Sequence, residues 1–190
     1  MNVTKKSIIL AAIFLVISLL IYIYSNFLVK DPEFDKTLFP SFVITDGDIS
    51  IYDKNGKLSK TLVATKITYY ESKQLYELEN PFVTTYEYSS DGKVNLWHLK
   101  AEKGNYIVDK SVTVTNNVVI FPGFENSNIK KATAKYLDYD LQKELITSDD
   151  LVTIYGDKFK TEGTVFSFDT KNNVLTYKGQ PHAVFYPNNQ

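Results

Sequence analysis

The stretch that decides the fold reads AKYLDYDLQKEL and runs from Ala134 to Leu145. It begins with a small residue, has Tyr139 five residues later and ends on an apolar residue eleven later. The same spacing occurs twice earlier in the chain, at Ala64, Tyr69 and Leu75 and at Ala101, Tyr106 and Val112. These three copies form an internal repeat.

A fourth copy is expected at the C-terminal end of the chain. It would start at Thr164 and have Leu175 in the apolar place, but Asp169 stands where the pattern has tyrosine, so this copy is degenerate. Between the repeat positions apolar and polar residues alternate with a period of two, which predicts strands. Turn signals separate these runs at residues 54–56, 90–92, 122–123 and 171–173. Aligned hairpin units of this kind predict an all-β domain, an elongated jelly roll with two sheets facing across an open-ended interior.

The composition excludes several classes of site. The chain has no cysteine, so a disulfide framework and a thiolate metal site are both absent. All 21 basic residues are lysine, which lacks the bidentate fork of arginine, and 22 acidic residues oppose them. We therefore expect no nucleic-acid binding. The 14 tyrosines and 12 phenylalanines suit a half-buried pleated sheet.

The N-terminal segment carries no charge from residue 7 to residue 29, which is long enough to cross a bilayer as a helix. Lys5 and Lys6 precede it, so we expect residues 1–6 in the cytoplasm, a transmembrane anchor at 7–29, a tether at 30–40 and a periplasmic domain at 41–190. A cleavable signal peptide is the alternative, but its apolar stretch is usually shorter.

Several local segments, taken in order, carry a family resemblance. They are IYDKNG at 51–56, NPFVTTY at 80–86 and TSDDLVTIYG at 147–156. This order resembles the OstA-type (OstA/LptA-like) β-jelly-roll family, and an anchor followed by residues 41–190 is similar to the LptC family. The resemblance implies lipopolysaccharide (LPS) transport without bond chemistry or a cofactor. It also implies an ABC transporter (LptB, LptF and LptG) and periplasmic LptA as partners at the inner membrane.

Acyl chains that cross water need an apolar groove, and two inner sheet faces can form one. The candidates for lining it are Leu62, Ala64, Leu99, Ala101, Val112, Val114, Val118, Ile120, Ala132, Ala134 and Leu151. Ordinary core packing is the alternative at each of these positions.

Partner contacts are expected at the two edges of the jelly roll, where unpaired backbone groups can accept another strand. By resemblance, the strand at 44–53 meets LptF and the strand at 174–185 meets LptA. The edge candidates are Ile44, Ile49, Ile51, Val174, Leu175, Tyr177 and Val184. Protection of these edges by Asp46, Asp48 and Pro181 is the alternative. Two glycines are structural candidates: Gly56 in a turn, and Gly156 at a bulge, a close backbone approach or a plain turn.

Two other functions remain to be weighed. The candidate catalytic residues are His98, His182 and the pair Asp149 and Asp150. His98 alternates away from the apolar face of its strand, so we expect it to point into solvent. Neither histidine has a second ligand at metal spacing, and no nucleophile or phosphate-loop motif is present, so an enzyme is not expected. An anchored periplasmic scaffold with a packed interior and no lipid cargo is the other alternative.

Overall fold

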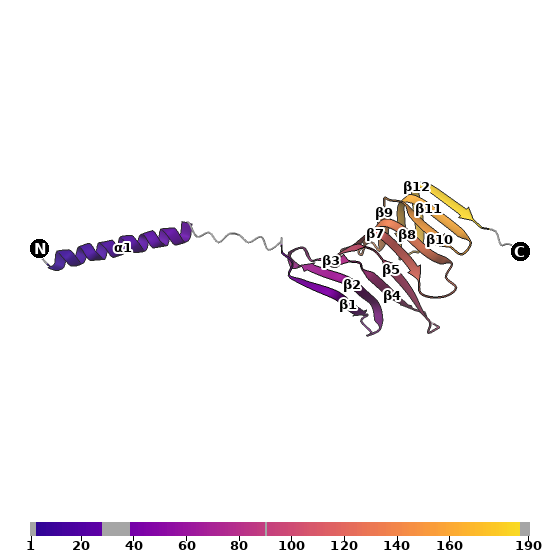
Figure 1. The fold of residues 1–190 in the computed structure, drawn as a ribbon, viewed down its shortest axis with the longest axis horizontal. Helices are drawn as coiled ribbons and strands as arrows, with labels where there is room; N and C mark the ends of the chain where they lie inside the picture. Colours follow the sequence, from indigo (N-terminus) through magenta and orange to yellow (C-terminus); the bar gives the residue numbers. More distant parts are fainter. Residues whose placement is uncertain (1–2, 28–38, 90, 187–190) are drawn as a thin grey trace. The chain divides into compact units, whose positions relative to one another are not determined.

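The computed structural model describes residues 3–27, 39–89 and 91–186, and the chain divides into two compact units. The first unit contains the helix α1 (Val3–Phe27), and the second begins at Phe39 (Figure 1). Within the described residues, no helix combines the length and hydropathy expected of a membrane span. The predicted tether lies outside the described residues except at 39–40, as do residues 1–2 of the predicted cytoplasmic end and 28–29 of the predicted anchor.

The second unit is all-β, as predicted. Its strands are β1 (Phe42–Tyr52), β2 (Leu58–Tyr70), β3 (Leu75–Glu79), β4 (Phe82–Tyr88), β5 (Val94–Lys100), β6 (Lys103–Ile107), β7 (Ser111–Pro122), β8 (Ile129–Asp140), β9 (Leu145–Ser148), β10 (Val152–Gly156), β11 (Phe159–Asp169) and β12 (Val174–Phe185). A short 3-10 turn at Glu71–Lys73 joins β2 to β3.

Six long strands, β1, β2, β7, β8, β11 and β12, each run through two half-sheets. One end of β2 pairs with β4 and the other with β3, and β7 divides in the same way between β5 and β6. β8 and β11 divide between β10 and β9. The first half-sheet therefore contains β4, β5 and β10, the second contains β3, β6 and β9, and the long strands join them along one crease.

The bend at the crease uses unusual backbone conformations in four of the long strands. Asp46 in β1, Asn116 and Asn117 in β7, Val165 in β11 and Gln180 in β12 all have positive φ values, between 47° and 63°. Strand pairing also shifts register between Thr115 and Val118. Such left-handed residues turn the chain sharply, which lets one strand leave the first half-sheet and enter the second.

The two half-sheets face each other, because their inner side chains pack into shared clusters. In one cluster Val118 and Val152 of the first half-sheet pack with Val114, Leu137 and Phe166 of the second. In another, Ile67 and Leu78 of the second half-sheet pack with Leu62 and Ile49 of the first. The interior therefore lies between the two halves and is closed on one side by the crease.

Strand pairing corrects the position of the fourth repeat. Tyr139 pairs with Ile146, and Ile146 pairs with Phe168, so Phe168 takes the place of the repeat tyrosine. The small residue five positions earlier is Gly163, which pairs with Val152. The expectation of a copy starting at Thr164 was one residue out of register, because glycine takes the small position in this copy and the pairing of β11 with β12 shifts register between Glu162 and Thr164.

The crease leads to a prediction about side-chain volume. Ala64 is 1% exposed, whereas its neighbour Val63 is 46% exposed on the opposite face of β2. We expect Ala64→Leu to lower the free energy of unfolding by about 1–3 kcal/mol, because added methyl groups overpack the crease. Val63→Leu, the matched control, is expected to stay within about 0.5 kcal/mol of the parent. Urea unfolding followed by the fluorescence of Trp97, the one tryptophan of the chain, measures both. Equal stability of the two variants would contradict the prediction.

Candidate functional site

The inner face is organised as rows of residues that pair from strand to strand across the whole unit. The first inner row lies in the first half-sheet and consists of Ile49, Leu62, Val83, Leu99, Ile120, Ala132, Ile154, Thr161 and Ala183. The crease row consists of Gly47, Ala64, Pro81, Ala101, Val118, Ala134, Val152 and Gly163.

Two more rows lie in the second half-sheet. The second inner row consists of Ile44, Ile67, Leu78, Gly104, Val114, Leu137, Ser148, Phe166 and Tyr177. The tyrosine row, farther from the crease, consists of Phe42, Tyr69, Tyr76, Tyr106, Val112, Tyr139, Ile146, Phe168 and Leu175. None of the four rows contains a charged residue, so together they form an uncharged surface from β1 to β12.

Burial decreases with distance from the crease. Ala64, Val118 and Val152 are 1–2% exposed in the crease row. In the tyrosine row every residue is at least partly exposed, and Phe42 reaches 42%. The first inner row is likewise partly exposed except at the buried Ile154. The interior is therefore closed and packed at the crease, and its side chains become more exposed toward the opposite side, which we call the mouth.

A sequence signal for the crease lies within the repeat, although the period-two analysis missed it. Inward positions along β8 are Ala132 and Ala134, then Leu137 and Tyr139, so two outward residues in succession separate the pairs. The same step separates Gly163 from Phe166 in β11. The pattern small-x-x-apolar-x-aromatic thus marks where a long strand passes from one half-sheet to the other.

Ten of the eleven predicted groove residues belong to the inner rows. Leu62, Leu99, Ile120 and Ala132 lie in the first inner row, and Val112 and Val114 lie in the second half-sheet. The other four are in the crease row: Ala64, Ala101, Val118 and Ala134. The structure thus brings these ten side chains into one interior, although their contact with a lipid stays a prediction.

Leu151 is placed apart from the others. It is 52% exposed, whereas Val152 is 2% exposed and occupies the position in the crease row. The prediction was one residue out of register, because Val152 follows Ala134 by 18 residues, whereas Val118 follows Ala101 by 17.

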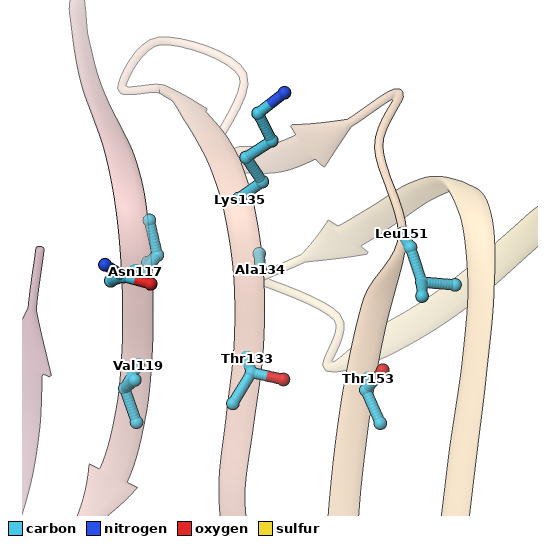
Figure 2. A pocket seen from close by; sticks show the side chains of 8 residues that line it. Asn117, Val119, Thr133, Ala134, Lys135, Leu151 and Thr153 are labelled. Atoms are coloured by element: carbon cyan, nitrogen blue, oxygen red, sulfur yellow. The ribbon is translucent and has the colours of Figure 1, made fainter.

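Leu151 instead lines an outer pocket of about 330 Å³. Figure 2 shows it between Asn117 and Val119 of β7, Thr133 and Lys135 of β8, and Thr153 of β10. Val118 and Ala134 also line it, but the side chains of Thr133 and Thr153 alternate with the inner residues Ala134 and Val152, so this hollow is on the outer face of the sheet.

The predicted partner strands form the two edges of the described sheet. β1 pairs with β2 and β12 pairs with β11, and each has no second strand partner among the described residues. Ile51, Val174 and Leu175 are 45%, 54% and 38% exposed. Ile44, Ile49 and Tyr177 belong to the inner rows, and Val184 is partly exposed on β12. The structure therefore provides an open edge at each end, and the partners stay a prediction.

The two structural glycines have different reasons for lacking a side chain. Gly56 has a φ of 77° in the turn between β1 and β2 and has open space around it. At Gly156 the ring of Phe159 lies so close that an added Cβ would clash with its Cε1 atom. The pairing of β10 with β8 also shifts register between Tyr155 and Gly156. Gly156 therefore combines a bulge with a close approach.

The candidate catalytic residues do not assemble into a reactive group. His98 is on the outer face, but it is partly buried instead of free in solvent: its Nδ1 is 3.0 Å from the hydroxyl of Thr84, and Phe82 and Phe121 flank its ring. His182 pairs with Glu162 on β11. In the described part of the chain, no cluster of histidine and acidic residues could hold a metal ion.

Charge pairs lie away from the inner rows. Lys160 is 2.7 Å from Glu162, and this ammonium holds the pKa of the Glu162 carboxyl below its usual value. Among the described residues, Tyr177 is the one whose buried side-chain hydroxyl makes no hydrogen bond of normal geometry, although the Thr161 side chain lies near it. Burial raises the pKa of Tyr177 to about 12, from an ordinary value of 10.0.

Comparison of the sequence with a family model and with curated proteins finds matches that agree with each other. A family model described as lipopolysaccharide-assembly, LptC-related matches residues 8–186. The lipopolysaccharide export system protein LptC of Escherichia coli (strain K12) is 27% identical over 124 residues, which cover 65% of this chain and 63% of that protein. The LptC of Shigella flexneri matches equally. The match thus spans less than two thirds of the length of these relatives.

A search of solved structures matched the crystal structure of LptH from Pseudomonas aeruginosa. It is described as the LptA-homologous periplasmic component of a lipopolysaccharide transport device. The match covers 80% of this chain and 99% of that one, with 12% identity and a TM-score of 0.49.

Tyr177 leads to a prediction about alkaline pH. Because the folded-state pKa of this phenol is raised, the phenol ionises first in the unfolded chain, so the fold loses stability as the pH rises from about 10 to about 12. We expect Tyr177→Phe to raise the free energy of unfolding by about 1 kcal/mol at neutral pH, because it removes an unpartnered buried hydroxyl. Its advantage over the parent should grow between pH 9 and pH 11.5. Urea unfolding at each pH measures this, with Tyr52→Phe, at an exposed position, as the control. An advantage that does not change with pH would contradict the assignment.

Proposed function

The chain belongs to the LptC-related family of lipopolysaccharide-assembly proteins, and from that premise we propose that it carries LPS across the periplasm through its apolar cleft. In this proposal it is a single-pass inner-membrane component of the trans-envelope bridge. It receives LPS from the ABC transporter formed by LptB, LptF and LptG and passes it to periplasmic LptA. The observation that carries the proposal is the uncharged inner surface that opens away from the crease.

The dimensions of the inner surface support transport along it. Each complete row crosses the strands from β1 to β12, and with about 4.8 Å between neighbouring strands its length is roughly 40 Å. Acyl chains gain favourable free energy by leaving water for an apolar surface, in proportion to the area buried. Because the rows continue from strand to strand, a lipid would move along the cleft without crossing a charged side chain.

The same geometry supports partners at the two edges. A strand that pairs with β12 adds one residue to each row. Backbone pairing with a partner would therefore also extend the apolar rows into that partner. The same holds for a strand that pairs with β1. We propose LptA at β12 and LptF at β1. The N-terminal segment, uncharged over residues 7–29, would hold the chain in the inner membrane with its first residues in the cytoplasm.

The lipid role can be tested by photo-crosslinking in intact cells. A photoreactive residue at Val112, which is partly exposed on the inner face, is expected to form an LPS adduct. The matched control is Thr113, the next residue, whose hydroxyl donates to Asp138 at 2.6 Å on the outer face. Adducts at Val112 alone support transport. Absence of an adduct at Val112, with normal folding, would leave an anchored scaffold without lipid cargo.

The partner edges can be tested with single cysteines, because the natural chain has none. Val174→Cys on β12, carrying a thiol-linked crosslinker, is expected to capture LptA, and Ile51→Cys on β1 is expected to capture LptF. Val63→Cys is the control, since Val63 is 46% exposed but lies on β2 between the edges. Equal capture from all three positions, or none from the edges, would argue against strand addition.

The anchor can be tested by extraction at alkaline pH. The full chain is expected to remain with the membrane pellet. A variant that starts at Phe39, exported behind a cleavable signal peptide, is expected in the soluble periplasmic fraction. Release of the full chain by the same treatment would remove the anchor from the proposal.

A further inference from the structure

We propose that the tyrosine row is the level at which the saccharide headgroup of a bound LPS sits, above acyl chains whose methyl ends reach the crease row. This inference rests on the proposed function and adds to it a depth and an orientation for the cargo. Four observations carry it: the contacts between the rings of the row, the state of its hydroxyl groups, its distance from the crease and the polarity of the deeper rows.

The aromatic part of the row forms a continuous series of rings across four strands. The ring centroids of Phe42 and Tyr69 are 5.1 Å apart, those of Tyr69 and Tyr76 are 4.4 Å apart, and those of Tyr76 and Tyr106 are 5.8 Å apart. The last two pairs are stacked, and Tyr139 and Phe168 occupy the same level farther along. A row of this kind combines apolar ring surface with polar edges, which suits the boundary between hydrocarbon and a hydrated group.

The hydroxyl groups of this row are available to a ligand. No described protein group hydrogen-bonds to the hydroxyls of Tyr69, Tyr76 or Tyr106, and none of the three is a buried unpartnered atom. These phenols are therefore accessible, unlike the buried hydroxyl of Tyr177 in the adjacent second inner row. An ordinary core would gain nothing from these oxygens, whereas a saccharide offers each of them donors and acceptors.

The distance from the crease matches one acyl chain. Five residues separate Ala64 from Tyr69, and the same number separates Ala134 from Tyr139 and Gly163 from Phe168. At about 3.3 Å per residue this is about 16 Å along each strand. One leaflet of a bilayer contributes half of a hydrocarbon core of about 30 Å, or about 15 Å. A chain with its methyl end at the crease would thus bring its carbonyl end to the tyrosines.

The polarity of the rows agrees with this orientation. The crease row and the second inner row contain no tyrosine except Tyr177 at the β12 end, so the deeper levels offer almost no hydroxyl group to a sugar. In membrane proteins, tyrosine and tryptophan gather at headgroup level for the same physical reason. The tyrosine row would therefore act as the aromatic belt of a membrane protein does: the polar group of an amphiphile lies at its level, and the acyl chains lie deeper.

The test compares two ligands on variants of the full chain in mild detergent: a fluorescent LPS with a short core and a fluorescent tetradecanoate. Tyr76→Phe and Tyr106→Phe keep the ring and remove the hydroxyl. We expect each to weaken LPS binding about three- to tenfold, the usual value of one hydrogen bond, and to leave tetradecanoate binding unchanged. Tyr70→Phe is the matched control, because Tyr70 neighbours Tyr69 but lies on the opposite face of β2.

Three outcomes would overturn the inference. If the Phe variants bind LPS as the parent does, the hydroxyls have no part in recognition. If they lose affinity for both ligands equally, the row is part of the acyl wall and not the headgroup level. If the parent binds tetradecanoate but not LPS, or binds neither, the proposed function fails as well, and this result is distinguishable because it needs no variant.

Discussion

Six long strands must bend at one level while keeping their pairing, and the whole interior depends on the small side chains at that level. Where two half-sheets meet, the inner faces approach most closely, and the buried residues there are no larger than valine or proline, as at Gly47, Ala64 and Val118. Gly163 makes the same point, since an added Cβ would come within 2.8 Å of the Tyr177 ring. Leucine, phenylalanine and tyrosine occupy the rows farther out, where the outermost row is partly exposed.

The architecture of the rows could largely be predicted from the sequence, because the repeat of small, aromatic and apolar positions is a direct consequence of strand pairing. Ala64, Ala101 and Ala134 do share the crease row, and Tyr69, Tyr106 and Tyr139 do share the tyrosine row. The two edge strands could also be predicted, because hairpin units that pair in chain order leave the first and the last strand at the edges of the sheet.

What could not be predicted depends on how the chain crosses the crease. The left-handed residues there are mostly Asn, Asp and Gln, but Val165 also adopts a φ of 49°, which no propensity indicates. An irregular link moved the inward position from Leu151 to Val152, and a register shift in β11 hid Gly163 as the fourth small residue. His98 alternates outward as expected, yet aromatic neighbours on adjacent strands cover it. Contacts with residues far apart in the sequence decide these positions and their burial, so the local periodicity of the sequence cannot predict them.

The most direct test of the account is nuclear magnetic resonance of the chain with labelled Ile, Leu and Val methyl groups and bound LPS. The account predicts nuclear Overhauser contacts from acyl protons to the inner methyls of Ile120 and Val114. It predicts none to Leu151 or Val63 on the outer face. Contacts confined to the outer methyls, or an inner set unchanged by saturating LPS, would contradict a lipid-carrying cleft and leave a packed domain in its place.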